Sequence, residues 1–245
     1  MYLLFGEYWQ YYLLGIILLP GIILAAWAQI RVSSTYSKYN KVLASKGLTG
    51  AEVARKILDA KGVFDVQVRQ IDGELTDNYN PSTKTLSLSK AVYNGIDIAA
   101  FGVAAHECGH AVQHAEGYAP LKIRKALAIA SNISSQLLWP LVIMGIIFNF
   151  AFVGGVVGDI FLWSGVIFFG LSVIFSLITL PVEFNASNRA LELLVSTGCV
   201  DKMEVKGAKK VLSAAAMTYV AALIVSMLNL ARFLIFVFIN TRRDD

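Results

Sequence analysis

The sequence of 245 residues contains little cysteine, little histidine and little charge. The shortages of cysteine and of charge exclude whole classes of protein. Its two cysteines, Cys108 and Cys199, cannot build the disulfide framework of a small secreted domain, and they suit a reducing compartment. Charged residues make up 16% of the chain against 56% hydrophobic residues, and the mean hydropathy is +0.61. This balance excludes an ordinary soluble domain and is typical of an integral membrane protein.

Four apolar stretches are long enough to cross a bilayer as helices, since about 20 residues span its hydrocarbon core. We expect these spans at residues 11–30, 133–153, 160–180 and 211–231. The first stretch differs from a secretory signal because residues 1–10 contain no Lys or Arg. We therefore expect it to remain on the protein as an anchor.

Basic residues are missing from residues 1–30 and 131–182, and 18 of the 21 lie in the loops 31–125 and 183–210. By the positive-inside rule, both loops face the cytoplasm, which places the N-terminus and a turn near residues 154–159 outside. The same rule explains the net charge of +4 without a nucleic-acid partner. The expected surroundings are the lipid bilayer and the cytoplasm.

The C-terminal end leaves two alternatives open. A single crossing by residues 211–231 would leave Arg242 and Arg243 outside, against the positive-inside rule. Either a long helix continues outward with Arg232 reaching toward the far interface, or residues 233–239 lie in the membrane surface.

The loop of residues 31–125 has the patterns of a small α+β region. Thr49 and Glu52 form a capping-box pattern at the start of a helix that Gly62 ends. We then expect, in order, a half-buried strand at residues 64–68, a turn-rich stretch at 77–81, a second strand at 85–89 and a buried apolar helix at 98–113. Residues 86–89 either hold a substrate backbone as an edge strand or only support the helix as a hairpin strand.

All three histidines lie between His106 and His114, and two of them belong to an H-E-x-x-H sequence. His106 and His110 share one helix face, so both imidazoles can reach a single Zn²⁺ while Glu107 lies beside the open coordination position. A zinc-bound water is the nucleophile of a metallopeptidase. The alternative is two surface histidines on an ordinary helix. Cys108 lies about 200° around the helix from His106 and is expected to fill the core.

A catalytic zinc normally has three protein ligands, and two nearby candidates for the third one fail. His114 follows His106 by eight residues, about 12 Å along the axis, so one straight helix cannot bring both to the same ion. We expect it to contact a ligand or to lie at the surface. Glu116 occupies the position of the third histidine in the metzincin pattern, which gives no support for a carboxylate there.

Glu183 is a better candidate, although two membrane spans separate it from His110. It stands where the third span re-enters the cytoplasm, and a carboxylate beside apolar surface needs a partner, which zinc would provide. The alternative is an interfacial Glu183 that pairs with Arg189 or Lys210.

The combination of H-E-x-x-H with a distant E-F-x-A resembles the membrane gluzincins of the HtpX type, and more closely the YugP-like neutral zinc metallopeptidases of bacterial membranes. The resemblance rests on residues 73–81, 83–86, 106–120 and 183–190. It implies a Zn²⁺ cofactor held by His106, His110 and Glu183, with Glu107 as the general base. One position departs from the HtpX type: Ser187 replaces an Asp that would orient a ligand histidine, and it can form only one weaker hydrogen bond.

We therefore predict a mainly α membrane protein of about four transmembrane helices with a small α+β, zincin-like catalytic part in the cytoplasm. The expected parts are an N-terminal transmembrane anchor, a cytoplasmic α+β region with the H-E-x-x-H helix, a transmembrane hairpin, a cytoplasmic third-ligand helix, and a C-terminal transmembrane helix with its tail. In that order they cover residues 1–30, 31–130, 131–182, 183–210 and 211–245.

The expected function is a zinc endopeptidase embedded in the bacterial plasma membrane, which hydrolyses membrane or juxtamembrane proteins at the cytoplasmic face. The alternative is a zinc-containing scaffold that binds membrane-protein partners without protease activity, and a fourth ligand such as His114 would favour it. A transporter has little support, because residues 133–180 contain one ionisable group, Asp159. The group that stabilises the oxyanion stays open among Arg189, Tyr118 and Tyr219.

Overall fold

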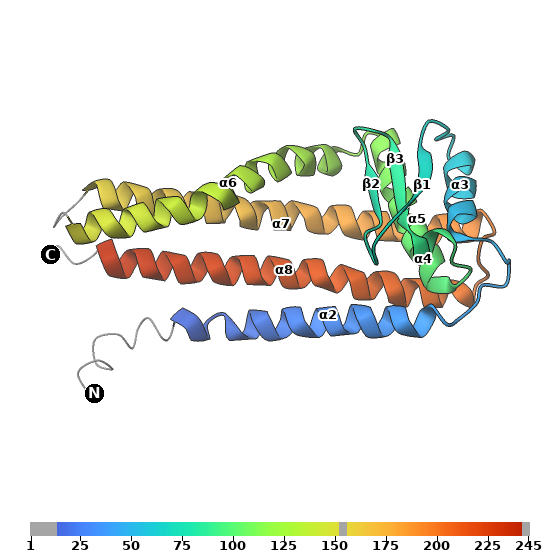
Figure 1. Ribbon diagram of the computed structural model, residues 1–245, viewed down its shortest axis with the longest axis horizontal. Coiled ribbons are helices and arrows are strands. Elements are labelled where there is room, and N and C mark those ends of the chain that lie inside the picture. The colour runs from blue at the N-terminus through green and yellow to red at the C-terminus, as the bar shows by residue number, and fades with distance from the viewer. Residues whose placement is uncertain (1–13, 152–155, 242–245) are drawn as a thin grey trace. The chain divides into compact units, whose positions relative to one another are not determined.

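The computed structural model describes residues 14–151 and 156–241 (Figure 1). Four of its helices are, by length and composition, able to cross a membrane, which confirms the expected number of candidate spans. They are α2 (Leu19–Tyr39), α6 (Ala119–Ala151), α7 (Val156–Ser196) and α8 (Glu204–Thr241). The first candidate span extends back to Leu14, and the rest of the expected anchor lies outside the described residues.

The chain divides into two compact units. We name one the site unit, which comprises Ala28–Lys122 and Leu180–Thr218. The other is the membrane unit, which comprises Met1–Trp27, Ile123–Thr179 and Tyr219–Asp245. The division groups the C-terminal part of α7 with the α+β region, although more than fifty residues separate them in the sequence.

The site unit contains a three-stranded sheet and three helices besides its parts of the long ones. These elements are α3 (Gly50–Ala60), β1 (Gln67–Ile71), β2 (Asn78–Asn80), β3 (Thr85–Ser89), α4 (Lys90–Tyr93) and α5 (Ile98–Ala115). The strand order is β1-β3-β2, with β1 parallel and β2 antiparallel to β3. Helix α5 contacts both β2 and β3, as well as α3 and α4 (Figure 1).

The position of β3 in the sheet argues against one hypothesis. Residues 85–89 pair with β1 on one side, residues 85–87 also pair with β2 on the other, and all five are buried. The Ser89 N–H beyond β2 already donates to Asp77, so β3 has little backbone edge left to hold a substrate by strand addition. The supporting role expected as the alternative is the one that agrees with the structure.

Two local predictions around this sheet also need correction. The first strand begins at Gln67 instead of Phe64, whose side chain is 72% exposed. The turn-rich stretch at 77–81 contains the short strand β2. The reason is a contact across the chain: the Asp77 carboxylate accepts hydrogen bonds from the backbone N–H and the hydroxyl of Ser89, at 2.7 and 3.1 Å. This contact brings the following residues alongside β3.

The helices of the site unit agree closely with the sequence patterns. The capping box of Thr49 and Glu52 is present at the start of α3, and the Asp97 carboxylate caps α5 by accepting from the N–H of Ala100 at 2.9 Å. Helix α5 is buried along most of its length, as expected. At Gly109 it comes so close to α7 that an added Cβ would lie 2.5 Å from the carbonyl oxygen of Ala186. The absence of a side chain at Gly109 therefore lets the two helices meet at the metal-ligand candidates.

The membrane unit has its own small apolar core, formed by Val142, Leu162, Phe233 and Val237. Helix α8 runs without a break to Thr241, which favours the long-helix alternative over a separate surface segment at 233–239. Helix α7 already begins at Val156, so part of the expected outer turn is helical, and its residues 154–155 lie outside the described residues.

Candidate metal centre

Three potential metal ligands converge in the site unit from two helices. Helix α5 provides His106 and His110, and α7 provides Glu183. One ligand atom from each of the three residues lies within 4.8 Å of the others. The Glu183 Oε2 atom is 3.2 Å from the Nε2 atom of His106 and 3.5 Å from that of His110. The structure thus brings together the three residues that the sequence proposed as zinc ligands.

The chemistry of this donor set fits zinc. Two imidazole nitrogens and one carboxylate form the three-ligand set of a catalytic zinc, which leaves a fourth position for water. Glu183 is almost fully buried, at 1% exposure, so its charge needs a partner in place of solvent. In the protein alone the two imidazoles serve as that partner. Burial by itself lowers the pKa of His110, but the combined effect of Glu183, Glu107 and Gln113 outweighs it and raises the pKa.

Glu107 lies between the two histidines in the sequence of α5 and is buried, at 8% exposure. Burial raises the pKa of its carboxyl group, while the neighbouring His106 and His110 act in the opposite direction. A carboxylate with a raised pKa is a better proton acceptor than an exposed one, which suits a general base. Cys108, the next residue, is fully buried in the core and lies outside the metal cluster, as expected.

Ser187 contacts the first ligand histidine. Its hydroxyl oxygen lies 3.2 Å from the Nδ1 atom of His106, on the side of the ring opposite to the Nε2 atom that faces Glu183. This is the single hydrogen bond expected of a serine at this position. A hydroxyl can donate or accept, so Ser187 orients His106 without deciding which ring nitrogen carries the proton.

Gln113 contacts the second ligand histidine, a role that the sequence patterns did not indicate. The side chain is fully buried, and its Oε1 atom lies 3.0 Å from His110 Nδ1. Its amide nitrogen donates to the carbonyl oxygen of Val182 and to the Asn185 Oδ1 atom, both at 2.9 Å. Because both amide hydrogens are in use, the oxygen must face His110, and Nδ1 of that histidine must be the donor. In the neutral imidazole of His110, with the hydrogen on Nδ1, the Nε2 atom that faces Glu183 carries none and is the atom that a metal would bind.

The spacing of Gln113 was the signal that could have revealed its role. It follows His110 by three residues and so lies on the same side of α5, directly after the buried Ala111 and Val112. A buried amide needs hydrogen-bond partners, and a ligand histidine is one.

Arg189 pairs with a different carboxylate from the one considered in the sequence. Its guanidinium forms an ion pair with Glu116, donates to Asn185 Oδ1 at 2.8 Å and lies 5.9 Å from the ring centroid of Tyr118. These contacts support the Asn185 amide that in turn holds Gln113. They account for Arg189 and Tyr118 as structural groups, and an oxyanion role for either stays a prediction.

His114 lies apart from the metal cluster, in agreement with the helix geometry. Its Nδ1 atom is 2.8 Å from the Tyr79 hydroxyl, and burial, together with Asp65, raises the pKa of Tyr79 to about 12. The hydroxyl therefore stays protonated at neutral pH. Within residues 14–151 and 156–241, no fourth His, Cys, Asp or Glu joins the His106, His110 and Glu183 cluster. The described residues thus give an open three-ligand site and not the closed one that the scaffold alternative requires.

Comparison with known proteins agrees with this arrangement. The family model described as "Putative neutral zinc metallopeptidase" matches residues 14–238. The "Putative membrane protease YugP" of Bacillus subtilis (strain 168) is 46% identical over 223 residues, which cover 91% of this chain and 95% of that protein. No solved structure matches the chain. The match extends over the candidate ligands of both helices and over the candidate spans.

Proposed function

This chain belongs to the family described as putative neutral zinc metallopeptidases, and on this basis we propose that it is a membrane-embedded zinc endopeptidase. The observation that carries the proposal is the convergence of His106, His110 and Glu183 within 4.8 Å, next to the buried carboxyl group of Glu107. Together they make up the ligands and the base of a metal-dependent hydrolase.

Each residue has a defined task in this mechanism. His106, His110 and Glu183 would hold the zinc, which when bound supplies a Lewis acid that polarises the scissile carbonyl and acidifies a water molecule. Glu107 accepts the proton of the attacking water and delivers it to the leaving amine. Gln113 and Ser187 keep the two imidazoles oriented, so that the ligand atoms need little rearrangement.

We further propose that the site faces the cytoplasm of a bacterial plasma membrane. The support is the charge distribution, because 18 of 21 basic residues lie in the two loops that contribute to the site unit. Both native cysteines are buried, so a single cysteine introduced at the surface can report the orientation by its labelling. A cysteine introduced at the exposed Lys61 should react with a membrane-impermeant maleimide in inverted vesicles and stay unlabelled in intact cells. The reverse pattern would contradict the orientation.

The proposed substrates are membrane proteins or their juxtamembrane segments. Four candidate spans support this choice, because a protein held in the bilayer meets other membrane-anchored chains first. The test is co-reconstitution of the full-length protein with a panel of single-span reporters that differ in their juxtamembrane sequences. Mass spectrometry should detect cleavage in the presence of zinc and far less with Glu107→Gln. If the protein binds one zinc ion and cleaves no reporter, the scaffold alternative replaces the endopeptidase.

A further inference from the structure

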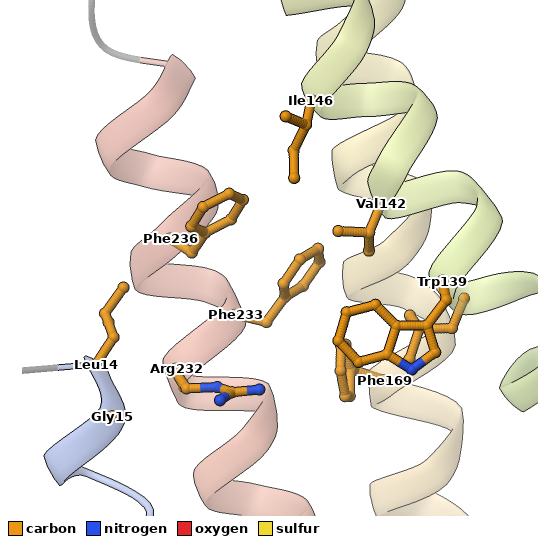
Figure 2. Close-up of a pocket in the computed structure, with 10 residues that line it drawn as sticks. Leu14, Gly15, Trp139, Val142, Ile146, Phe169, Arg232, Phe233 and Phe236 are labelled. Carbon is orange, nitrogen blue, oxygen red and sulfur yellow. The ribbon is translucent and has the colours of Figure 1, made fainter. Parts of the chain in front are cut away.

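The membrane unit contains a cavity of about 310 Å³ that the peptidase chemistry does not use (Figure 2). Its walls come from α6, α7 and α8, with Leu14 and Gly15 at the side of the first span. Part of the lining is packed: Val142 and Phe233 are each 7% exposed, and the Phe233 ring lies 5.1 Å from that of Phe169 between centroids. Trp139, by contrast, is 61% exposed, so the cavity opens beside it. The volume is that of a small ligand pocket.

The cavity is apolar except for one charge. Arg232 lines it, and Figure 2 shows the side chain leaving α8 toward the side where Phe169 and Trp139 lie. Among the lining residues the only polar side-chain groups are the Arg232 guanidinium and the Trp139 indole N–H. Both groups donate hydrogen bonds and neither accepts. The cavity therefore selects an acceptor that carries negative charge.

The membrane unit supplies no such acceptor within its described residues. The described residues of this unit include one acidic side chain, that of Asp159. They comprise residues 14–27, 123–151, 156–179 and 219–241. Asp159 already accepts from Asn149 at 3.4 Å, and it lies ten residues, about 15 Å, along α7 from Phe169. The counter-charge for Arg232 must then come from outside the described part of this unit.

Arg232 also lies deep in its helix. It precedes Thr241 by nine residues, about 13.5 Å along α8, and its neighbours are mostly apolar, with Asn229 before it and Phe233–Ile239 after it. A lone charge at such a position in a membrane span is costly and marks a functional site by default. The sequence alternative, in which Arg232 only reaches toward the interface, does not explain why its side chain lines a cavity beside Phe169, Phe233 and Phe236.

We propose that this cavity binds an anionic phospholipid, with one acyl chain against the aromatic walls and the phosphate at Arg232. The guanidinium would donate two parallel hydrogen bonds to phosphate oxygens, and the Trp139 indole would provide a further donor. A net negative charge favours binding, because the positive headgroup of a zwitterionic lipid would lie near the positive Arg232, with no acidic side chain among the lining residues to offset the repulsion. This lipid site is independent of zinc and of the proposed peptidase activity, and its occupation stabilises the membrane unit by mass action.

Native mass spectrometry of the delipidated full-length protein tests the proposal. The protein is mixed with equal amounts of dioleoyl phosphatidylglycerol and dioleoyl phosphatidylcholine, and the bound lipid is counted. The wild type should retain phosphatidylglycerol preferentially, and Arg232→Gln should lower its affinity about tenfold with little change for phosphatidylcholine. Arg232→Lys should keep most of the preference. The matched control Arg124→Gln removes the same charge from α6 outside the cavity and should behave as the wild type.

Three outcomes would overturn the lipid site. In the first, Arg124→Gln lowers phosphatidylglycerol binding as much as Arg232→Gln, which indicates general charge attraction. In the second, the wild type shows no preference. In the third, sodium oleate binds in an Arg232-dependent way and phosphatidylglycerol does not, which assigns the cavity to a fatty acid. If Arg232→Gln fails to fold, Ile146→Phe fills the cavity and must lower the retention of phosphatidylglycerol, and unchanged retention refutes the site.

Discussion

The site unit and the membrane unit both place charge against apolar side chains, but they balance it differently. In the site unit the chain supplies the partners: Glu183 lies between two imidazoles, and Arg189 pairs with Glu116. In the membrane unit Arg232 lines a cavity whose other polar group, Trp139, is also a donor. Glu183, whose partners are already in place, indicates a site organised in advance for a metal. Arg232, which has no acidic partner among the lining residues, indicates a site whose partner is a bound ligand.

The largest expected effect is a loss of cleavage without a loss of zinc, when the general base of the site unit is replaced. Glu107→Gln keeps the size of the side chain but removes its ability to accept a proton, so cleavage should fall by about 10²–10⁴-fold. Zinc content should stay at the wild-type level, because Glu107 is not in the ligand cluster. Reporter cleavage and metal analysis on the same sample measure both. The control Glu192→Gln, at an exposed position of α7, should change neither, and full cleavage by Glu107→Gln would refute the mechanism.

A second variant tests whether the buried amide prepares His110 for the metal. Gln113→Leu removes the hydrogen-bond acceptor for His110 Nδ1 and keeps a side chain of similar size. The affinity for zinc should weaken about 10–100-fold. Competition with a chelator of known affinity measures this in the purified protein. Gln70→Leu serves as the control, because it removes an amide that accepts a hydrogen bond from the exposed Asn94 at 3.0 Å, outside the metal cluster. Equal affinity in wild type and Gln113→Leu would show that the amide only packs.

Ser187→Ala should weaken zinc by less than Gln113→Leu, tenfold at most. The hydroxyl makes one contact of 3.2 Å with His106, whereas Gln113 is fixed by three partners. The same chelator competition measures the loss, with Ser196→Ala on the exposed side of α7 as the control. A larger loss for Ser187→Ala than for Gln113→Leu would reverse the order of the two orienting groups.

The smallest expected effect is a loss of local stability in α3 of the site unit, away from the metal ligands. Thr49→Ala removes the capping box of α3 and should cost about 1 kcal/mol of local stability. Hydrogen exchange should show faster opening of the first turn of α3, with zinc content unchanged. Thr83→Ala, at an exposed position, is the control. Loss of zinc in Thr49→Ala would mean that the metal site depends on α3 more directly than its contacts with α5 suggest.

Local patterns allowed much of the fold to be predicted. The capping box at Thr49, the buried helix around His106 and the four apolar spans each depend on residues close together in sequence, and each is present. Helix geometry alone also removed His114 from the ligand set. Glu183 was found because a carboxylate at the end of an apolar span needs a partner, and resemblance to a known family supported the same residue.

The features that could not be predicted depend on contacts between distant residues. The sheet order follows from the contact of Asp77 with Ser89, twelve residues apart, which places β2 beside β3 and makes residues 85–89 central. Gln113 gains its role only from Val182 and Asn185 on another helix. The sequence places Arg232 directly after the expected span 211–231, but does not reveal the cavity that its side chain lines.

The central claim is that Glu183 completes the metal site begun by the H-E-x-x-H helix. The most direct test is the zinc content of purified full-length protein, wild type beside Glu183→Ala and the matched control His114→Ala, after dialysis against a weak chelator. We expect about one zinc ion per chain in the wild type and in His114→Ala, and a loss of most of it in Glu183→Ala. Wild-type zinc content in Glu183→Ala, or a loss confined to His114→Ala, would contradict the account.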